Sequence, residues 1–304
     1  TLSILIGLCL PLAAWAQDAT VSSPDNRLRV DVTVKEGKPV YGVTYQSATI
    51  LEDSPLGFVA NVGDFTRGLT FAGAERKTLD ETYRLDRIKQ SEVHYRANEL
   101  AVSLKDAAGR TFDVVFRVSN NDVAFRYELP RFGETGSIVI EREATGFDFP
   151  EGTTTFLTPQ SDAMIGWKRT KPSYEEVYKP DAPMSERSQY GHGYTFPGLF
   201  HVSGSHWALV SETGVDRRYC ASHLSDATPD GLYTVAFPMP EENNAFVSQL
   251  NGDTLAGAFK NATSNYKTTG YFTTGGSITV TVSGELFTDG VDTRWKDATF
   301  SLWK

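Results

Sequence analysis

The sequence predicts an all-β protein in which short antiparallel strands form a large β-sandwich. Apolar residues recur at every second position in many short runs, which is the period of a half-buried strand. Turn-forming residues separate these runs, and no stretch keeps the period of an amphipathic helix. Strands joined in this way pack as two facing sheets with polar outer faces. We therefore expect the core to lie between two sheets.

The alternation is clearest over residues 28–34, 114–118 and 123–127. Glycine, asparagine and aspartate, which accept the backbone conformations of tight turns, stand between such runs. The predicted turns are Glu36-Gly37-Lys38-Pro39, Asp106-Ala107-Ala108-Gly109 and Ser119-Asn120-Asn121-Asp122. Short turns of this kind connect neighbouring antiparallel strands. The pattern thus predicts a series of hairpins.

The first residues resemble a secretory signal peptide. Residues 2–12 form an apolar run, and Ala14 and Ala16 are small residues at the two positions that a signal peptidase reads. The run is too short to span a bilayer. We expect residues 1–16 to be part of a signal peptide and the mature protein to be periplasmic or secreted, with no membrane partner after removal of the signal. An N-terminal anchor is the alternative, which no second apolar stretch supports.

Charge and cysteine content exclude several classes of function. The formal net charge of −9 argues against nucleic acid or an anionic membrane as partner, because both favour a basic surface. Cys9 lies in the signal segment, so Cys220 is the only cysteine of the mature chain and cannot form an intramolecular disulfide. A free cysteine is most often a small buried hydrophobic residue, and we interpret Cys220 in this way.

The strand pattern is interrupted over residues 146–198, which contain six prolines and many aromatic residues. Proline is excluded from central strands, and long irregular segments of this kind are commonly functional. Aromatic faces beside carboxylates and imidazoles suit a sugar ring, which offers C–H groups for stacking and hydroxyls for hydrogen bonds. Attachment of a long loop to the sandwich explains the same composition equally well. The candidate substrate-binding residues are Trp167, Tyr174, Glu175, Tyr178, His192 and Tyr194.

Several sequence blocks resemble one family of glycosidases. The most specific are SYEEVYKP at residues 173–180, GHGYTFPGLFHV at 191–202 and GLYTVAFP at 231–238. Earlier blocks are SSPDNRLRVDV at 22–32 and FRVSNNDVAFRYELP at 116–130. Together they resemble the N-terminal domain of glycoside hydrolase family 97, whose members are α-glucosidases and α-galactosidases. The resemblance covers about residues 23–238.

This resemblance implies a β-super-sandwich related to galactose-mutarotase domains over residues 17–240. In the family this domain packs against a (β/α)₈ barrel that carries the catalytic carboxylates, and the present sequence ends at Lys304 without such a barrel. No catalytic residue can therefore be transferred to this chain. The implied partners are an oligosaccharide or α-glycoside and the missing barrel, and the chain alone is expected to be inactive.

The resemblance also implies calcium. A glutamate of the SYE motif helps to bind Ca²⁺ at the domain interface in the family, and that motif corresponds here to Ser173-Tyr174-Glu175. Glu175 is therefore the predicted metal ligand, with Glu176 as the alternative if the register is shifted by one. Ca²⁺ needs several oxygen ligands, and the others belong to the barrel. Two ordinary solvated glutamates are the remaining interpretation.

Residues 241–304 differ from the family and are left unassigned. They are rich in Thr, Ser, Gly and Asn, and strands are predicted at residues 278–282 and 299–303. Asn251-Gly252 is a candidate hairpin turn. We describe this segment only as divergent and β-rich.

Other functions were weighed against the glycosidase interpretation. A stand-alone carbohydrate-binding or mutarotase-like domain is one alternative, with His192 and Glu175 as the only acid–base pair the sequence offers. A β-domain that serves only for packing is another. A zinc site at His201 and His206 has little support, because no further ligand pattern surrounds these residues, and we expect them to flank a hairpin.

Overall fold

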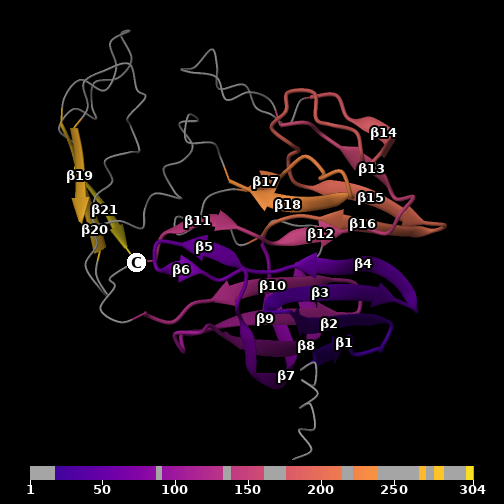
Figure 1. The fold of residues 1–304 in the computed structure, drawn as a ribbon, viewed down its shortest axis with the longest axis horizontal. Helices are drawn as coiled ribbons and strands as arrows, with labels where there is room; N and C mark the ends of the chain where they lie inside the picture. Colours follow the sequence, from indigo (N-terminus) through magenta and orange to yellow (C-terminus); the bar gives the residue numbers. More distant parts are fainter. Residues whose placement is uncertain are drawn as a thin grey trace, which may run out of the picture.

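The computed structural model describes residues 18–86, 91–132, 138–160, 176–213 and 222–237, and the backbone of three later strands. These residues form strands and turns and contain no helix, so the all-β prediction is confirmed (Figure 1). Among the described residues, no helix is long and apolar enough to cross a membrane. The predicted signal segment lies outside the described residues.

Two four-stranded antiparallel sheets make up the first half of the sandwich. One has the strand order β1-β2-β3-β4, formed by Asp18–Ser22, Leu28–Lys35, Lys38–Tyr45 and Ala48–Pro55. The other has the order β10-β9-β8-β7, formed by Val123–Glu128, Thr111–Ser119, Glu92–Lys105 and Thr70–Arg84. They face each other across a core in which the ring of Tyr41 lies 5.3 Å from that of Phe125 and 5.8 Å from that of Phe116.

Three further sheets complete the domain, and a fourth lies near the end of the chain. Two have three strands, in the orders β11-β5-β6 (Ile140–Glu143, Phe58–Ala60, Gly63–Asp64) and β12-β18-β17 (Gly146–Asp148, Leu232–Ala236, His223–Leu224). The four-stranded sheet β14-β13-β15-β16 comprises Lys179–Pro183, Thr154–Leu157, Gly198–Ser203 and His206–Val210. The late sheet β19-β20-β21 comprises Lys267–Tyr271, Ser277–Ser283 and Thr299–Trp303.

The alternating pattern explains which side of each strand is buried. In β2, Leu28, Val30 and Val32 are buried, whereas Arg29 is exposed and Asp31 is half-buried. Each apolar side chain on the inner side removes its surface from water, which stabilises the fold by about 25 cal/mol for every Å² buried. The three runs recognised in the sequence are strands β2, β9 and β10, as predicted.

The predicted turns also occur, with one adjustment. Gly109 N donates to Asp106 O at 3.0 Å in the β8–β9 turn, and Ser119 N donates to Asp122 O at 2.9 Å before β10. The first turn is tighter than the sequence suggests, because Pro39 already pairs with Val34 in the β2–β3 ladder. The strands predicted at residues 278–282 and 299–303 are confirmed as β20 and β21, whereas Asn251-Gly252 lies outside the described residues.

A second aromatic cluster holds the later sheets together. Phe200 of β15 is fully buried, and its ring stacks on that of Phe149 with a centroid distance of 4.0 Å. The same ring meets the edge of Tyr233 of β18 at 5.3 Å. Rings in these arrangements add attraction beyond the area that they bury. The cluster therefore packs the inner side of sheet β14-β13-β15-β16 against sheet β12-β18-β17.

The β7–β8 hairpin extends past the sheet to which it belongs. Its ladder runs from the pair Thr70–Lys105 to the pair Arg84–Glu92, whereas β9 pairs with β8 only as far as Ala97. Strand β7 is the edge of this sheet, and its side chains are mostly exposed.

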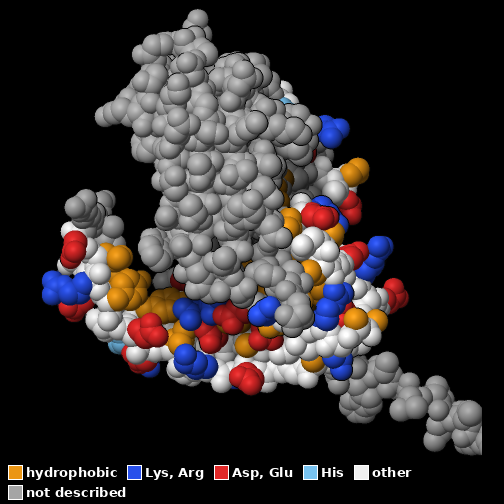
Figure 2. All heavy atoms as spheres, turned by 90° about the vertical axis from the view of Figure 1, so that its left-hand side faces the viewer, with side chains coloured by type: hydrophobic (Ala, Val, Ile, Leu, Met, Phe, Trp, Pro, Cys, Tyr) orange, Lys and Arg blue, Asp and Glu red, His pale blue; other side chains and the backbone are white. Residues whose placement is uncertain are grey.

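Figure 2 shows acidic and basic side chains interspersed on the described part of one face of the molecule.

Candidate functional site

The loop at residues 188–194 is the centre of the predicted site, and strand-like backbone contacts hold its end. Tyr194 forms isolated bridges with Pro159 on one side and Leu224 on the other. Its backbone exchanges two hydrogen bonds with Leu224, both of 2.8 Å. Gln160 N donates to Gly193 O at 2.8 Å beside them. The end of the loop is therefore fixed between two sheets.

No residue with a side chain fits at position 193 in this arrangement. The φ of Gly193 is +81°, a left-handed conformation that side chains disfavour, and a Cβ atom there would lie 2.0 Å from Leu224 O. Its N–H donates to the hydroxyl of Ser188 at 2.9 Å, while Ser188 N donates to Asp226 Oδ1 at 2.6 Å. The motif GHGY thus contains this glycine because the backbone must touch strand β17.

The described residues on either side of the segment with the SYE motif are hydrogen-bonded to this loop. The segment follows Gln160, which is bonded to Gly193, and leads to Glu176, whose Oε2 accepts a hydrogen bond of 3.0 Å from the hydroxyl of Tyr190. Glu176, the alternative metal ligand, is therefore already engaged by a phenol. The predicted site residues Trp167, Tyr174 and Glu175, and also Cys220, lie outside the described residues.

The remaining predicted site residues differ in what they offer a ligand. Tyr178 is 53% exposed, and its ring rests on that of Phe156 with a centroid distance of 4.8 Å. His192 is half-buried on the loop. The ring of Tyr194 is buried, and its hydroxyl donates to Glu186 O at 3.0 Å. Burial raises the pKa of Tyr194 to about 12, so this phenol stays neutral. A sugar contact by Tyr194 remains a prediction, whereas Tyr178 presents a ring at the surface.

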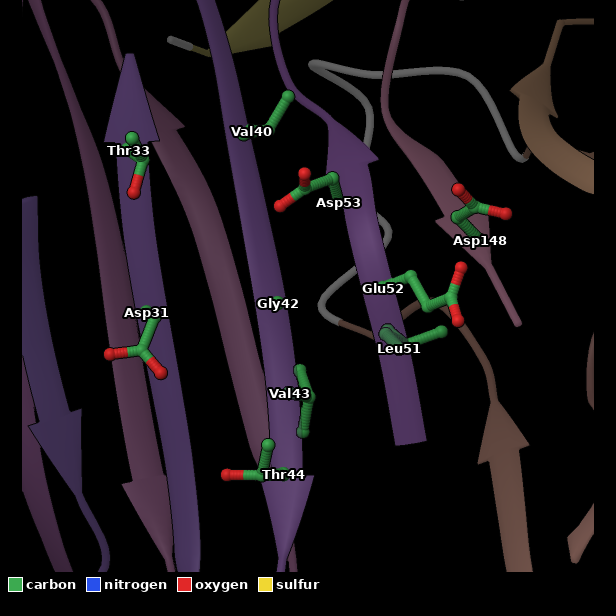
Figure 3. A pocket seen from close by; sticks show the side chains of 10 residues that line it. All are labelled: Asp31, Thr33, Val40, Gly42, Val43, Thr44, Leu51, Glu52, Asp53 and Asp148. Carbon is green, nitrogen blue, oxygen red and sulfur yellow. The ribbon is translucent and has the colours of Figure 1, made fainter. Parts of the chain in front are cut away.

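A separate acidic hollow of about 490 Å³ lies on the outer side of strands β2, β3 and β4, next to β12 (Figure 3). Four carboxylates line it. Two have cationic partners, since Asp31 pairs with Arg29 at 2.6 Å and Asp53 pairs with Lys35. The other two, Glu52 and Asp148, lie next to each other where β4 meets β12, as Figure 3 shows, with Gly42 in the floor.

Asp148 is the perturbed group of this hollow. Partial burial raises the pKa of its carboxyl group above the ordinary value, because burial disfavours the charged form. The negative charges of Glu52, Asp230 and Asp53 raise the pKa further. The hollow thus concentrates negative charge, but the described residues contain no group of three or more His, Cys, Asp or Glu side chains arranged to hold a metal ion.

The two histidines of the β15–β16 hairpin have separate structural contacts, as expected. His201 Nε2 lies 2.7 Å from Gly204 O, and its ring stacks on that of Trp207 at 4.3 Å. His206 meets the ring of Tyr45 edge-on at 6.2 Å. Trp207 was not among the predicted site residues, although its position alternates with half-buried positions in β16 and its side chain is 50% exposed. Reading β16 for its outward side chains would have found it.

Replacing Gly193 with Ala should destabilise the domain more than replacing Gly191 with Ala. Both glycines have positive φ, so each substitution carries a conformational penalty of about 1–2 kcal/mol. Only at Gly193 would the new Cβ also collide with Leu224 O, since nothing lies within 4 Å of the Gly191 position. Urea unfolding of the two variants measures the difference. Equal losses of unfolding free energy in the two variants would contradict the close contact of Gly193 with β17.

Replacing Asp148 with Asn should stabilise the protein at neutral pH. The folded-state pKa of Asp148 is raised, so the protein loses stability as pH rises through this pKa and the carboxylate becomes charged beside Glu52. At about pH 3 the carboxyl is protonated in both folded and unfolded states, and the variant should then match the wild type. Thermal unfolding at pH 7 and pH 3 tests this, with the exposed Asp86→Asn as control. An increase in unfolding temperature that is the same at pH 7 and pH 3 would refute this electrostatic explanation.

Comparison with known proteins places this fold in one family. The model of the family described as Glycosyl-hydrolase 97 N-terminal matches residues 21–271, which extends past residue 238, the end of the resemblance recognised in the sequence. A probable retaining alpha-galactosidase from Streptomyces bingchenggensis (strain BCW-1) is 31% identical over 239 residues, which are 74% of this chain and 34% of that protein.

Solved structures agree with this assignment. The crystal structure of a beta-arabinopyranosidase is 60% identical with a TM-score of 0.72, covering 75% of this chain and 36% of that one. A glycoside hydrolase family 97 enzyme from Pseudoalteromonas sp. strain K8, solved with acarbose, is 21% identical with a TM-score of 0.63 over 72% of this chain and 32% of that one, and supports the fold alone. This chain therefore spans about a third of the length of these proteins, and it belongs to the glycosyl-hydrolase 97 N-terminal family.

Proposed function

We propose that this chain is the N-terminal part of an exported glycosidase, which lies against the catalytic domain and supplies one edge of the sugar site. The observation that carries the proposal is the family match over residues 21–271, in a chain that spans only 36% of a neighbour 60% identical to it. Export rests on the signal-like segment at residues 1–16 and places the protein in the periplasm or outside the cell.

The substrate class that fits best is a galactose-configured pyranoside. The relative at 31% identity is named an alpha-galactosidase and the neighbour at 60% a beta-arabinopyranosidase. The ring of β-L-arabinopyranose has the stereochemistry of α-D-galactopyranose without the hydroxymethyl group, so the two names describe closely related substrates. The enzyme solved with acarbose is only 21% identical, and its ligand therefore carries less weight for this chain.

Within such an enzyme, this chain would bind rather than break the glycosidic bond. Hydrolysis needs two carboxyl groups about 5–10 Å apart across the bond, one as acid and the other as base or nucleophile. No residue of this chain is assigned to either role. Tyr178 can stack against a sugar ring from the domain edge, and the loop at residues 188–194 bonds to Gln160 and Glu176, the described residues before and after Tyr174 and Glu175 in the sequence. Their role is to orient the substrate.

Calcium is part of the same proposal. Glu175 would contribute one carboxylate to a Ca²⁺ ion, which takes six to eight oxygen ligands and whose charge would help to hold substrate oxygens in place. The described residues alone do not fit such an ion, because they offer no cluster of three ligand side chains. Glu176 is committed to Tyr190. The remaining ligands would have to come from the catalytic domain.

The chain alone should not hydrolyse nitrophenyl β-L-arabinopyranoside, α-D-galactopyranoside or α-D-glucopyranoside, because the paired carboxylates are not assigned to it. A chimera with the rest of the 60% identical neighbour should hydrolyse the arabinopyranoside. Release of nitrophenol measures both. Turnover by the chain alone, or an inactive but folded chimera, would contradict the proposal.

Calcium should bind the chain alone no tighter than about millimolar, since one glutamate cannot replace a full oxygen shell. In the chimera, the affinity should rise, and Glu175→Gln should lower it while Glu176→Gln does not. Calorimetry with CaCl₂ measures each case. Micromolar binding to the chain alone that Glu175→Gln abolishes would show that this chain has further ligands of its own.

A further inference from the structure

The outward side of sheet β14-β13-β15-β16 is unusually rich in exposed apolar and aromatic side chains. The register places Thr154, His201 and Trp207 in one row across β13, β15 and β16. The next row contains Phe156, Leu199 and Leu209. The alternate residues of these strands point inward to the core around Phe200, so both rows lie on the outer side.

Trp207 is held with its ring at the surface. Its indole stacks nearly parallel on the imidazole of His201, with a centroid distance of 4.3 Å and an interplanar angle of 10°. His201 is in turn fixed by the contact of Nε2 with Gly204 O at 2.7 Å. Trp207 nevertheless remains 50% exposed. A ring that is already ordered loses little conformational entropy when a ligand stacks on it.

A second ring pair lies diagonally across the same surface. Tyr178 rests on Phe156 and is 53% exposed. Phe156 and Trp207 lie two strands apart, which is about 10 Å across a sheet. Leu199 of β15 lies between the two ring pairs, and Leu209, 66% exposed, borders Leu199 on the edge strand β16. The surface is therefore a shallow strip with a ring at each end, and one end is Tyr178, a residue of the candidate sugar site.

Hydrogen-bonding groups border the strip. Thr154 Oγ1 donates to Asp181 Oδ1 at 3.3 Å, and both side chains remain accessible beside the aromatic row. Lys179, at the start of β14, pairs with Glu186 at 2.6 Å. Flat rings with carboxylate and hydroxyl groups at their edges match a pyranose, which has an apolar C–H face and a rim of hydroxyls.

We propose that this surface, from Trp207 across Leu199 to Tyr178, is a secondary binding site for a polysaccharide chain. A glycan is favoured over a protein partner because the strip ends at the candidate sugar site and because hydroxyl and carboxylate groups border its exposed rings. The site extends the proposed function from one sugar unit to the chain that carries it. Retention by polysaccharide requires no hydrolysis, so it tests this inference separately from the proposed activity.

The test is affinity electrophoresis of the full chain in native gels that contain larch arabinogalactan. The wild type should migrate more slowly than in a gel without polysaccharide. Trp207→Ala should raise the apparent dissociation constant about tenfold, equivalent to about 1.4 kcal/mol. Trp207→Phe should retain part of the binding. Tyr83→Ala, which removes another exposed ring on the distant β7–β8 hairpin, should bind like the wild type.

Circular dichroism and thermal unfolding establish that each variant is folded before it is compared. If soluble starch retains the protein in place of arabinogalactan, and Trp207→Ala again loses this retention, the binding site is upheld. Only the proposal that its ligand is of the galactose type would then be overturned. Wild-type mobility of Trp207→Ala would overturn the site. Absence of retention by both polysaccharides would also overturn the site. A dimer in size-exclusion chromatography that Trp207→Ala converts to a monomer would overturn it as well, because the surface would then be a contact between two copies of the chain.

Discussion

The paired backbone hydrogen bonds between Tyr194 and Leu224 hold together the part of the molecule for which we propose sugar binding. They connect the end of the loop at residues 188–194 to strand β17, and the bridge from Tyr194 to Pro159 connects the same point to the chain that leaves β13. The contact is possible only because Gly193 has no side chain. The same glycine accepts the hydrogen bond of Gln160 N, so the last described residue before the SYE motif is held at this point as well.

This constraint also determines how the aromatic residues are divided between core and surface. Tyr194 must turn inward once its backbone joins two strands, and it packs near Tyr233 with its hydroxyl bonded to Glu186 O. Tyr178 and Trp207 lie on strands or strand ends whose outer side has no covering sheet in the described part of the chain. These two exposed rings therefore belong to one sheet, β14-β13-β15-β16, rather than to the irregular segment as a whole.

The sequence predicts the local structure well and the long-range arrangement poorly. The alternation in β2, β9 and β10 identifies strands and their buried sides, because a period of two depends only on neighbouring residues. Whether Tyr194 faces the core depends on Pro159 and Leu224, which are 35 and 30 residues away. Trp207 lies outside the proline- and aromatic-rich segment of residues 146–198, and its contact with His201 across a hairpin depends on the strand register, which the sequence does not give. Resemblance to a family, and not periodicity, identified Glu175.

The edge strand β7 has a consequence for how the protein behaves in solution. It is fifteen residues long, and on one side it pairs with no other strand of the described residues, so it offers a row of backbone groups that another strand could join. Its central part reads Glu75-Arg76-Lys77, followed by Asp80 and Glu81, and all five are exposed. A strand from a second molecule would have to bring its own side chains against this dense row of charges. The edge that offers itself for sheet extension thus also carries the charges that oppose aggregation.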